Sequence, residues 1–169
     1  MLERLGMCVL FSIYNCVTDW KNGKIRNASV FLFACIAVLS QLIEHGGRGL
    51  LNAFGAAVIP LVMLPLFAVR MLGAGDIKAL MAIGLMVGFP TILYILAYSF
   101  LGAGVIAVAV MLIRKNGKER FRQLWNYCKC RFYGLPVSSY NGIDSSGAFR
   151  FSFGILAGVI VYVIQRLAQ

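Results

Sequence analysis

Long apolar segments separated by short polar turns dominate this chain of 169 residues and limit what it can fold into. Hydrophobic residues make up 60% of the sequence and charged residues 13%, which argues strongly against a soluble globular domain. A helix of about 20 apolar residues crosses a bilayer, so the chain has room for about six. We therefore predict an all-α polytopic membrane protein, with a single domain over residues 1–169 and six transmembrane helices. The predicted helices cover residues 1–18, 28–43, 50–69, 76–89, 91–113 and a segment from 151 towards the C-terminus.

Basic residues are unevenly divided between the two sides of this predicted bundle. Threading the helices alternately through a membrane places thirteen of the sixteen basic residues on one side, leaving only Arg4, Arg48 and Arg166 on the other. Basic residues concentrate in cytoplasmic loops, so both termini should lie outside the cell and the thirteen-residue side should be cytoplasmic. The loops on that side are 20–27, 70–78 and 114–150. The net charge of +10 then indicates contact with the anionic inner leaflet and not with nucleic acid.

A carboxylate stands where apolar sequence resumes after the third predicted helix, in the stretch Gly73-Ala74-Gly75-Asp76-Ile77-Lys78. A carboxylate at the edge of a bilayer is costly unless it is paired, hydrated or protonated, so Asp76 is a candidate functional residue. We expect Gly73 and Gly75 to adopt backbone conformations closed to other residues and to leave room beside Asp76 for another helix or chain. Asp76 itself is predicted to be the N-cap of the fourth helix.

A second carboxylate, Asp19, ends the first predicted helix on the same side of the membrane as Asp76. Adjacent packing of the two helices would bring the carboxylates together. Two nearby carboxylates cannot both ionise cheaply, and aspartic proteases use such a pair to activate a water molecule. Charges at the helix ends favour Asp76 as base and Asp19 as acid, although in a coupled pair the roles can be exchanged. Taken singly, a helix cap at Asp76 and a solvated helix end at Asp19 are the simpler interpretations.

The residues around both carboxylates resemble motifs of the type IV prepilin peptidase family. The stretch from Gly73 to Lys78 resembles the GxGD signature of that family. Thr18-Asp19-Trp20, followed by Lys24-Ile25-Arg26-Asn27, resembles its first aspartate motif, although Arg26 stands where the family usually has Pro. Phe151-Ser152-Phe153-Gly154 resembles the start of its last helix, so the resemblance covers nearly the whole chain.

This resemblance implies a multi-pass plasma-membrane peptidase that cleaves the leader of prepilins after a Gly at the cytoplasmic face. It implies that Asp19 and Asp76 are catalytic and that Gly73, Gly75 and Lys78 belong to the supporting loop of the active site. Lys78 either tunes Asp76 or extends to lipid headgroups. The implied partners are a prepilin or pseudopilin, with its basic leader and apolar helix, and membrane lipids. No metal or organic cofactor is implied.

The sequence is similar to the small members of the family, those of tight-adherence (Tad, Flp) pilus systems. Larger members carry a zinc-binding segment with two CxxC pairs and also methylate the new N-terminus, and no such segment occurs in this sequence. We predict that all five cysteines are free thiols. Cys128 and Cys130 lack the two further ligands that a zinc site needs.

The loop over residues 114–150 contains a candidate helix at about 118–133. Apolar residues recur there at helical spacing opposite basic ones, a pattern typical of a helix lying on the inner leaflet. The alternative is a basic linker.

Together these features predict an aspartic endopeptidase that acts on type IV prepilin-like proteins. The alternative is a non-enzymatic membrane protein, either a small transporter or a pilus or secretion assembly factor, in which the two aspartates serve ion or proton passage. A proton path would favour further polar residues through the bilayer, and the second, third and fifth predicted helices contain almost none.

Overall fold

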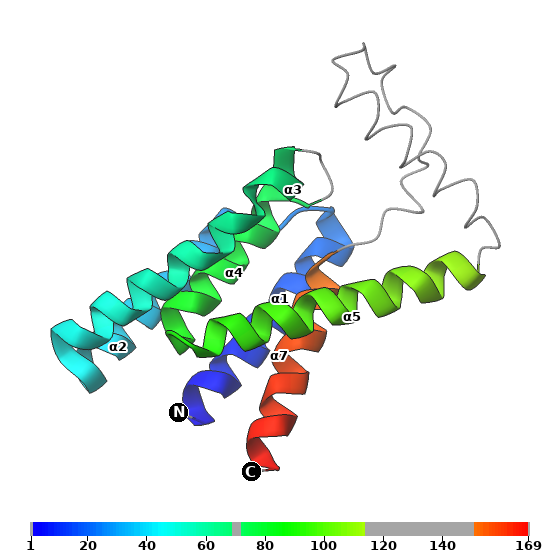
Figure 1. Cartoon of the computed structure of the whole chain (residues 1–169). Coiled ribbons are helices and arrows are strands. Elements are labelled where there is room, and N and C mark those ends of the chain that lie inside the picture. The colour runs from blue at the N-terminus through cyan, green and yellow to red at the C-terminus, as the bar shows by residue number, and fades with distance from the viewer. Residues whose placement is uncertain (1, 69–71, 114–150, 169) are drawn as a thin grey trace. The chain divides into compact units, whose positions relative to one another are not determined.

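The computed structural model describes residues 2–68, 72–113 and 151–168, and within these ranges all regular structure is helical. The helices are α1 (Leu2–Asn22), α2 (Asn27–Val58), the 3-10 helix η1 (Ile59–Met63), α3 (Leu64–Ala68), α4 (Ala74–Val87), α5 (Thr91–Ile113) and α7 (Phe151–Leu167) (Figure 1). The chain divides into one unit of Met1–Ala103 with Arg150–Gln169 and a second of Gly104–Phe149. Residues 104–113 of the second unit continue α5. The candidate helix at 118–133, Cys128, Cys130 and the rest of loop 114–150 lie outside the described residues.

Two described helical stretches are long and apolar enough to cross a membrane, Asn27–Phe67 and Thr91–Val110. Phe151–Leu167 is a shorter apolar helix. Large apolar side chains such as Leu51 and Leu101 lie exposed on these helices, as lipid-facing residues do. The described fold is therefore helical with two candidate membrane-spanning stretches, whereas the number of six spans and the outside position of the termini stay predictions.

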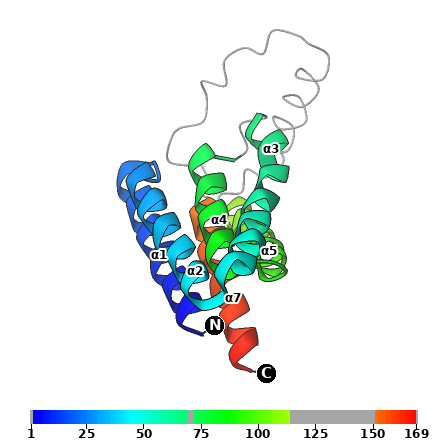
Figure 2. The ribbon, with the colours of Figure 1, turned by 90° about the vertical axis from the view of Figure 1, so that its left-hand side faces the viewer.

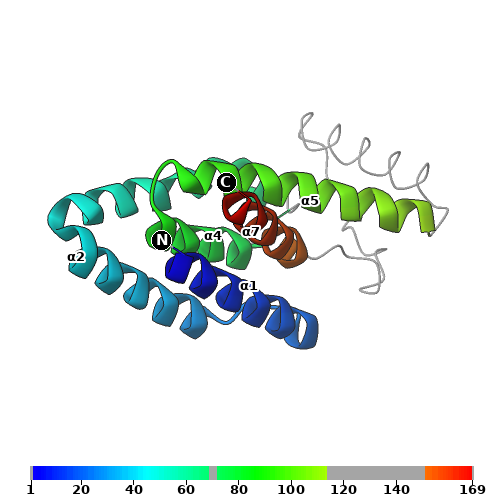
Figure 3. The same ribbon diagram turned by 90° about the horizontal axis from the view of Figure 1, so that it is seen from below.

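Helix α4 occupies the centre of the first unit, in contact with α2, η1, α1 and α7 (Figure 3). Its side chains Leu80, Ile83 and Met86 are fully buried. Gly84 allows close packing, because a Cβ atom there would lie 2.8 Å from the carbonyl oxygen of Ala56 on α2. With 14 residues, α4 is about 21 Å long, which is shorter than the hydrocarbon core of about 30 Å.

The turn predicted between the second and third helices, between residues 43 and 50, is confirmed. Within the stretch Asn27–Val58, which carries the single label α2, two helices meet at Gly46, whose φ of 59° and ψ of −150° are not helical, and the chain turns back there (Figure 3). The predicted helix over residues 50–69 is wrong in its second half, because the chain changes at Ile59 to the 3-10 helix η1. Pro60 stands at the start of η1 and cannot donate a backbone hydrogen bond to a continuing α-helix.

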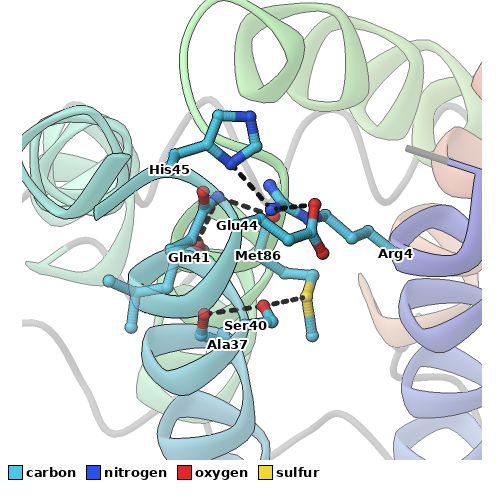
Figure 4. A network of polar contacts seen from close by, with 8 residues as sticks. Arg4, Ala37, Ser40, Gln41, Glu44, His45 and Met86 are labelled. Atoms are coloured by element: carbon cyan, nitrogen blue, oxygen red, sulfur yellow. Dashed lines mark hydrogen bonds and ion pairs between the residues drawn. The ribbon is translucent and has the colours of Figure 1, made fainter. Parts of the chain in front are cut away.

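A polar cluster joins α1 to the kink of α2 (Figure 4). The guanidinium of Arg4 forms an ion pair of 2.6 Å with Glu44 and lies 3.0 Å from Nδ1 of His45. Nearby, the side-chain amide of Gln41 donates hydrogen bonds to the carbonyl oxygens of Leu85 and Met86 at the C-terminal end of α4. These contacts fix α1, α2 and α4 to one another at the end of the unit where the chain begins.

Helices α5 and α7 pack closely through two glycines spaced four residues apart. A Cβ atom on Gly154 would lie 2.9 Å from the carbonyl oxygen of Ser99, and one on Gly158 would lie 2.5 Å from the backbone nitrogen of Ser99. Small residues at this spacing allow helix backbones to approach each other within a membrane. The contact with the backbone of α5 therefore limits where α7 can lie in the first unit.

Candidate active site

Asp19 lies in the last turn of α1, which continues three residues past Asp19. The helix ends where Gly23 takes a φ of 65° and its N–H donates to the carbonyl oxygen of Asp19 at 2.8 Å. The Asp19 side chain is buried, with 9% of the residue exposed. Its Oδ2 accepts a hydrogen bond of 2.7 Å from the hydroxyl of Ser152 on α7. Asp19 is thus a fixed residue inside the unit and not a solvated helix end.

Asp76 lies in the first turn of α4, but the prediction that it caps the helix is wrong. Gly73 is the N-cap, with an extended backbone, and Asp76 is the third residue after it. From there the carboxylate reaches back, and its Oδ2 accepts a hydrogen bond of 3.3 Å from the N–H of Gly73. Asp76 therefore lies at the N-terminal end of α4, where the first backbone N–H groups of a helix have no carbonyl partner within it.

The structure brings the two carboxylates together. The C-terminal end of α1, the N-terminal end of α4 and the start of α7 lie at one end of the first unit, away from both chain termini (Figure 2). Helices α1 and α4 are in contact, and Asp19 is close enough to Asp76 for the two charges to repel each other. Because the two carboxylates repel each other, it is unfavourable for both to be charged at the same time.

The two glycines before Asp76 are needed for space and not for unusual backbone angles. Gly73 has a φ of −79° and a ψ of 144°, and Gly75 lies within the helix α4. The expectation that both adopt conformations closed to other residues is therefore wrong. A Cβ atom on Gly75 would lie 3.1 Å from Cβ of Ile25, and one on Gly73 would lie 3.0 Å from Oδ2 of Asp76 itself. The first turn of α4 thus packs directly against the loop that follows α1.

Lys78 connects α4 to the start of α2. Its Nζ donates a hydrogen bond of 3.2 Å to the side-chain oxygen of Asn27, the first residue of α2. The two predicted roles of Lys78, the tuning of Asp76 and an extension to lipid headgroups, stay predictions. Ile25 and Asn27 therefore both hold the loop after α1 against α4 beside the two carboxylates.

Three further polar residues of this region were not predicted as site residues from the sequence: Ser152, Asn15 and Ser12. Ser152 belongs to a motif that was noted, but its hydrogen bond to Asp19 on α1 was not predicted. Asn15 precedes Asp19 by one helical turn and is buried, its Oδ1 accepts a hydrogen bond from Ser29, and its Nδ2 has no partner among the described residues. Ser12, another turn earlier, is also buried with an unpartnered hydroxyl in the described part of the chain. The spacing of Ser12, Asn15 and Asp19 along one face of α1 was the available signal.

The chemistry that this site can perform is acid–base chemistry. It contains two carboxylates, one hydroxyl donor and the N–H groups at the start of α4. Within residues 2–68, 72–113 and 151–168, no three His, Cys, Asp or Glu side chains are grouped as ligands for a metal ion. The fold and the site define a helical membrane protein with a pair of interacting carboxylates at one end of its helices.

The profile of the type IV leader peptidase family matches residues 6–108, which is more than half of the chain and includes both Asp19 and Asp76. The chain belongs to this family and is a leader-peptidase-like protease. No curated protein and no solved structure matches the chain.

Proposed function

We propose that this protein is an aspartic endopeptidase that removes the leader peptides of type IV prepilin-like proteins at the cytoplasmic face of the plasma membrane. The observation that carries the proposal is that Asp19 and Asp76, which come from separate helices, interact electrostatically. Both residues lie within the part of the chain that the family profile matches. Paired carboxylates sharing a proton are the groups that peptide hydrolysis without a covalent intermediate requires.

In the proposed reaction, the ionised carboxylate of the pair accepts a proton from a water molecule while the oxygen of that water attacks the scissile carbonyl carbon. The protonated carboxylate donates its proton to the carbonyl oxygen, giving a tetrahedral diol. The diol then collapses: the ionised carboxylate takes a proton from one diol hydroxyl, the C–N bond breaks, and the protonated carboxylate gives its proton to the leaving amine. One water is consumed, and the pair returns to its starting state of one shared proton.

The proposed substrate combines a basic leader with an apolar helix, as the family resemblance implies. Exposed apolar side chains on the described helices, such as Leu51 and Leu101, support an approach of the substrate helix through lipid. The excess of basic residues in loops 20–27, 70–78 and 114–150 supports a cytoplasmic position for the site. The proposal includes a place among the peptidases of tight-adherence pilus systems, whose small members the sequence resembles.

The direct test is cleavage of a prepilin by the purified protein in bilayers. We expect two products whose masses sum to that of the substrate plus one water, with the cut after the Gly that ends the leader. The control is the same prepilin with that Gly replaced by Leu, which should remain intact. Recovery of the wild-type prepilin uncut, with enzyme that is folded and inserted, would contradict the proposed function.

A further inference from the structure

Ser152 is linked directly to one of the two carboxylates, although it lies outside the residues that the family profile matches. From this contact we propose that Ser152 is a positioning residue that fixes the orientation of the Asp19 carboxylate. The proposal rests on the function proposed above, because it concerns the same pair of carboxylates.

The contact itself has the geometry of a strong hydrogen bond. The Ser152 hydroxyl lies 2.7 Å from Oδ2 of Asp19, and the two residues are 133 positions apart in sequence. Hydroxyl donors at this distance from a carboxylate make charge-assisted hydrogen bonds, which are about twice as strong as neutral ones. Ser152 is 2% exposed, so bulk water does not replace its hydroxyl at Asp19.

The helix that carries Ser152 is held from two directions. On the α1 side, the ring of Phe153 packs edge-on against Trp20, the neighbour of Asp19, with ring centroids 5.8 Å apart. On the α5 side, the ring of Phe151 packs against Phe100 at 5.5 Å. The residues before and after Ser152 are therefore anchored, and the hydroxyl is presented to Asp19 by a fixed turn.

Loss of the hydroxyl has a defined geometric consequence. Asp76 faces Asp19 from α4, and the charges of the two carboxylates repel each other. The bond from Ser152 holds Oδ2 of Asp19 in place against this repulsion, so its removal should let the Asp19 side chain turn away from its reacting position.

The test is Ser152→Ala in the full-length protein, reconstituted in bilayers with a prepilin substrate. We expect kcat to fall about tenfold while KM stays within about twofold of wild type, because the lost interaction orients the reacting carboxylate and does not bind substrate.

The matched control is Ser99→Ala. Ser99 is also a fully buried serine in a helix next to α7, but its hydroxyl has no hydrogen-bond partner in the described part of the chain. Its variant should keep the kcat and the KM of wild type. A change in the Ser99 variant equal to that in Ser152→Ala would show a general effect of losing a buried hydroxyl and would overturn the proposal.

Asp19→Asn, assayed alongside, separates the two hypotheses. If Asp19→Asn is inactive and Ser152→Ala has the kcat of wild type, the positioning role is wrong and the proposed function stands. If Asp19→Asn cleaves normally, the proposed function fails and the role of Ser152 fails with it. Protein abundance in the membrane fraction and thermal unfolding verify that each variant is folded.

Discussion

Asp19→Asn and Asp76→Asn are each expected to abolish cleavage of a co-expressed prepilin while the protein stays folded and inserted. Asn keeps the size of Asp and can still accept the hydrogen bonds from Ser152 and Gly73 that the structure shows. It can neither take a proton from water nor return one to the leaving amine, so acid–base catalysis stops. We expect the rate to fall by at least about 10²-fold to 10⁴-fold, measured as the gel shift of the prepilin with enzyme abundance checked in parallel.

Glu3→Gln is the control for this loss of a carboxylate. Glu3 lies in the first turn of α1, at the other end of the helix from Asp19, and is exposed. Its variant should process prepilin at the wild-type rate. Near wild-type processing by either single aspartate variant at normal abundance would contradict the paired mechanism, and the interpretation of the two aspartates as an ion or proton path would then become the better one.

The helices that the sequence predicted best are those with sharp chemical boundaries. Helix α5 covers Thr91–Ile113 as predicted, because Pro90 cannot continue the preceding helix and the apolar segment that follows is uninterrupted. The start of α7 at Phe151 also agrees with the prediction. The turn at Gly46 was predicted from the polar, glycine-containing residues 44–48, whereas the 3-10 helix at Pro60 was not, since Pro60 lies inside apolar sequence where hydrophobicity alone gives no boundary.

The carboxylate pair could be predicted from the sequence, but its surroundings could not. Alternate threading already placed Asp19 and Asp76 on one side of the membrane, and the contact of α1 with α4 then brings them together. The role of Gly73 as N-cap was missed because Asp is the commoner capping residue, whereas here the carboxylate bonds backwards from the third position. The bond from Ser152 to Asp19 depends on how α7 packs, which no local pattern determines.

The packing of α7 against α5 leads to the second large expected effect, that of Gly158→Ala. The added Cβ atom would lie 2.5 Å from the backbone nitrogen and 2.7 Å from Cα of Ser99, distances that real Cβ atoms do not reach. Backbone atoms cannot turn aside as a flexible side chain does, so α7 has to move away from α5. Overpacking of this kind costs about 1–3 kcal/mol of stability. Because Ser152 is on α7, its hydrogen bond to Asp19 should be lost as well.

Gly55→Ala provides the matched comparison for Gly158→Ala. Gly55 is also a helical glycine, within α2, but a Cβ atom there would meet nothing within 4 Å. Alanine is favoured over glycine inside a helix by about 1 kcal/mol, so Gly55→Ala should melt at or above the temperature of wild type and cleave prepilin normally. Gly158→Ala should melt at a lower temperature and cleave more slowly. Equal melting temperatures and equal cleavage rates for these two variants would show that α7 does not depend on close contact with Ser99, and the position of Ser152 would then need another cause.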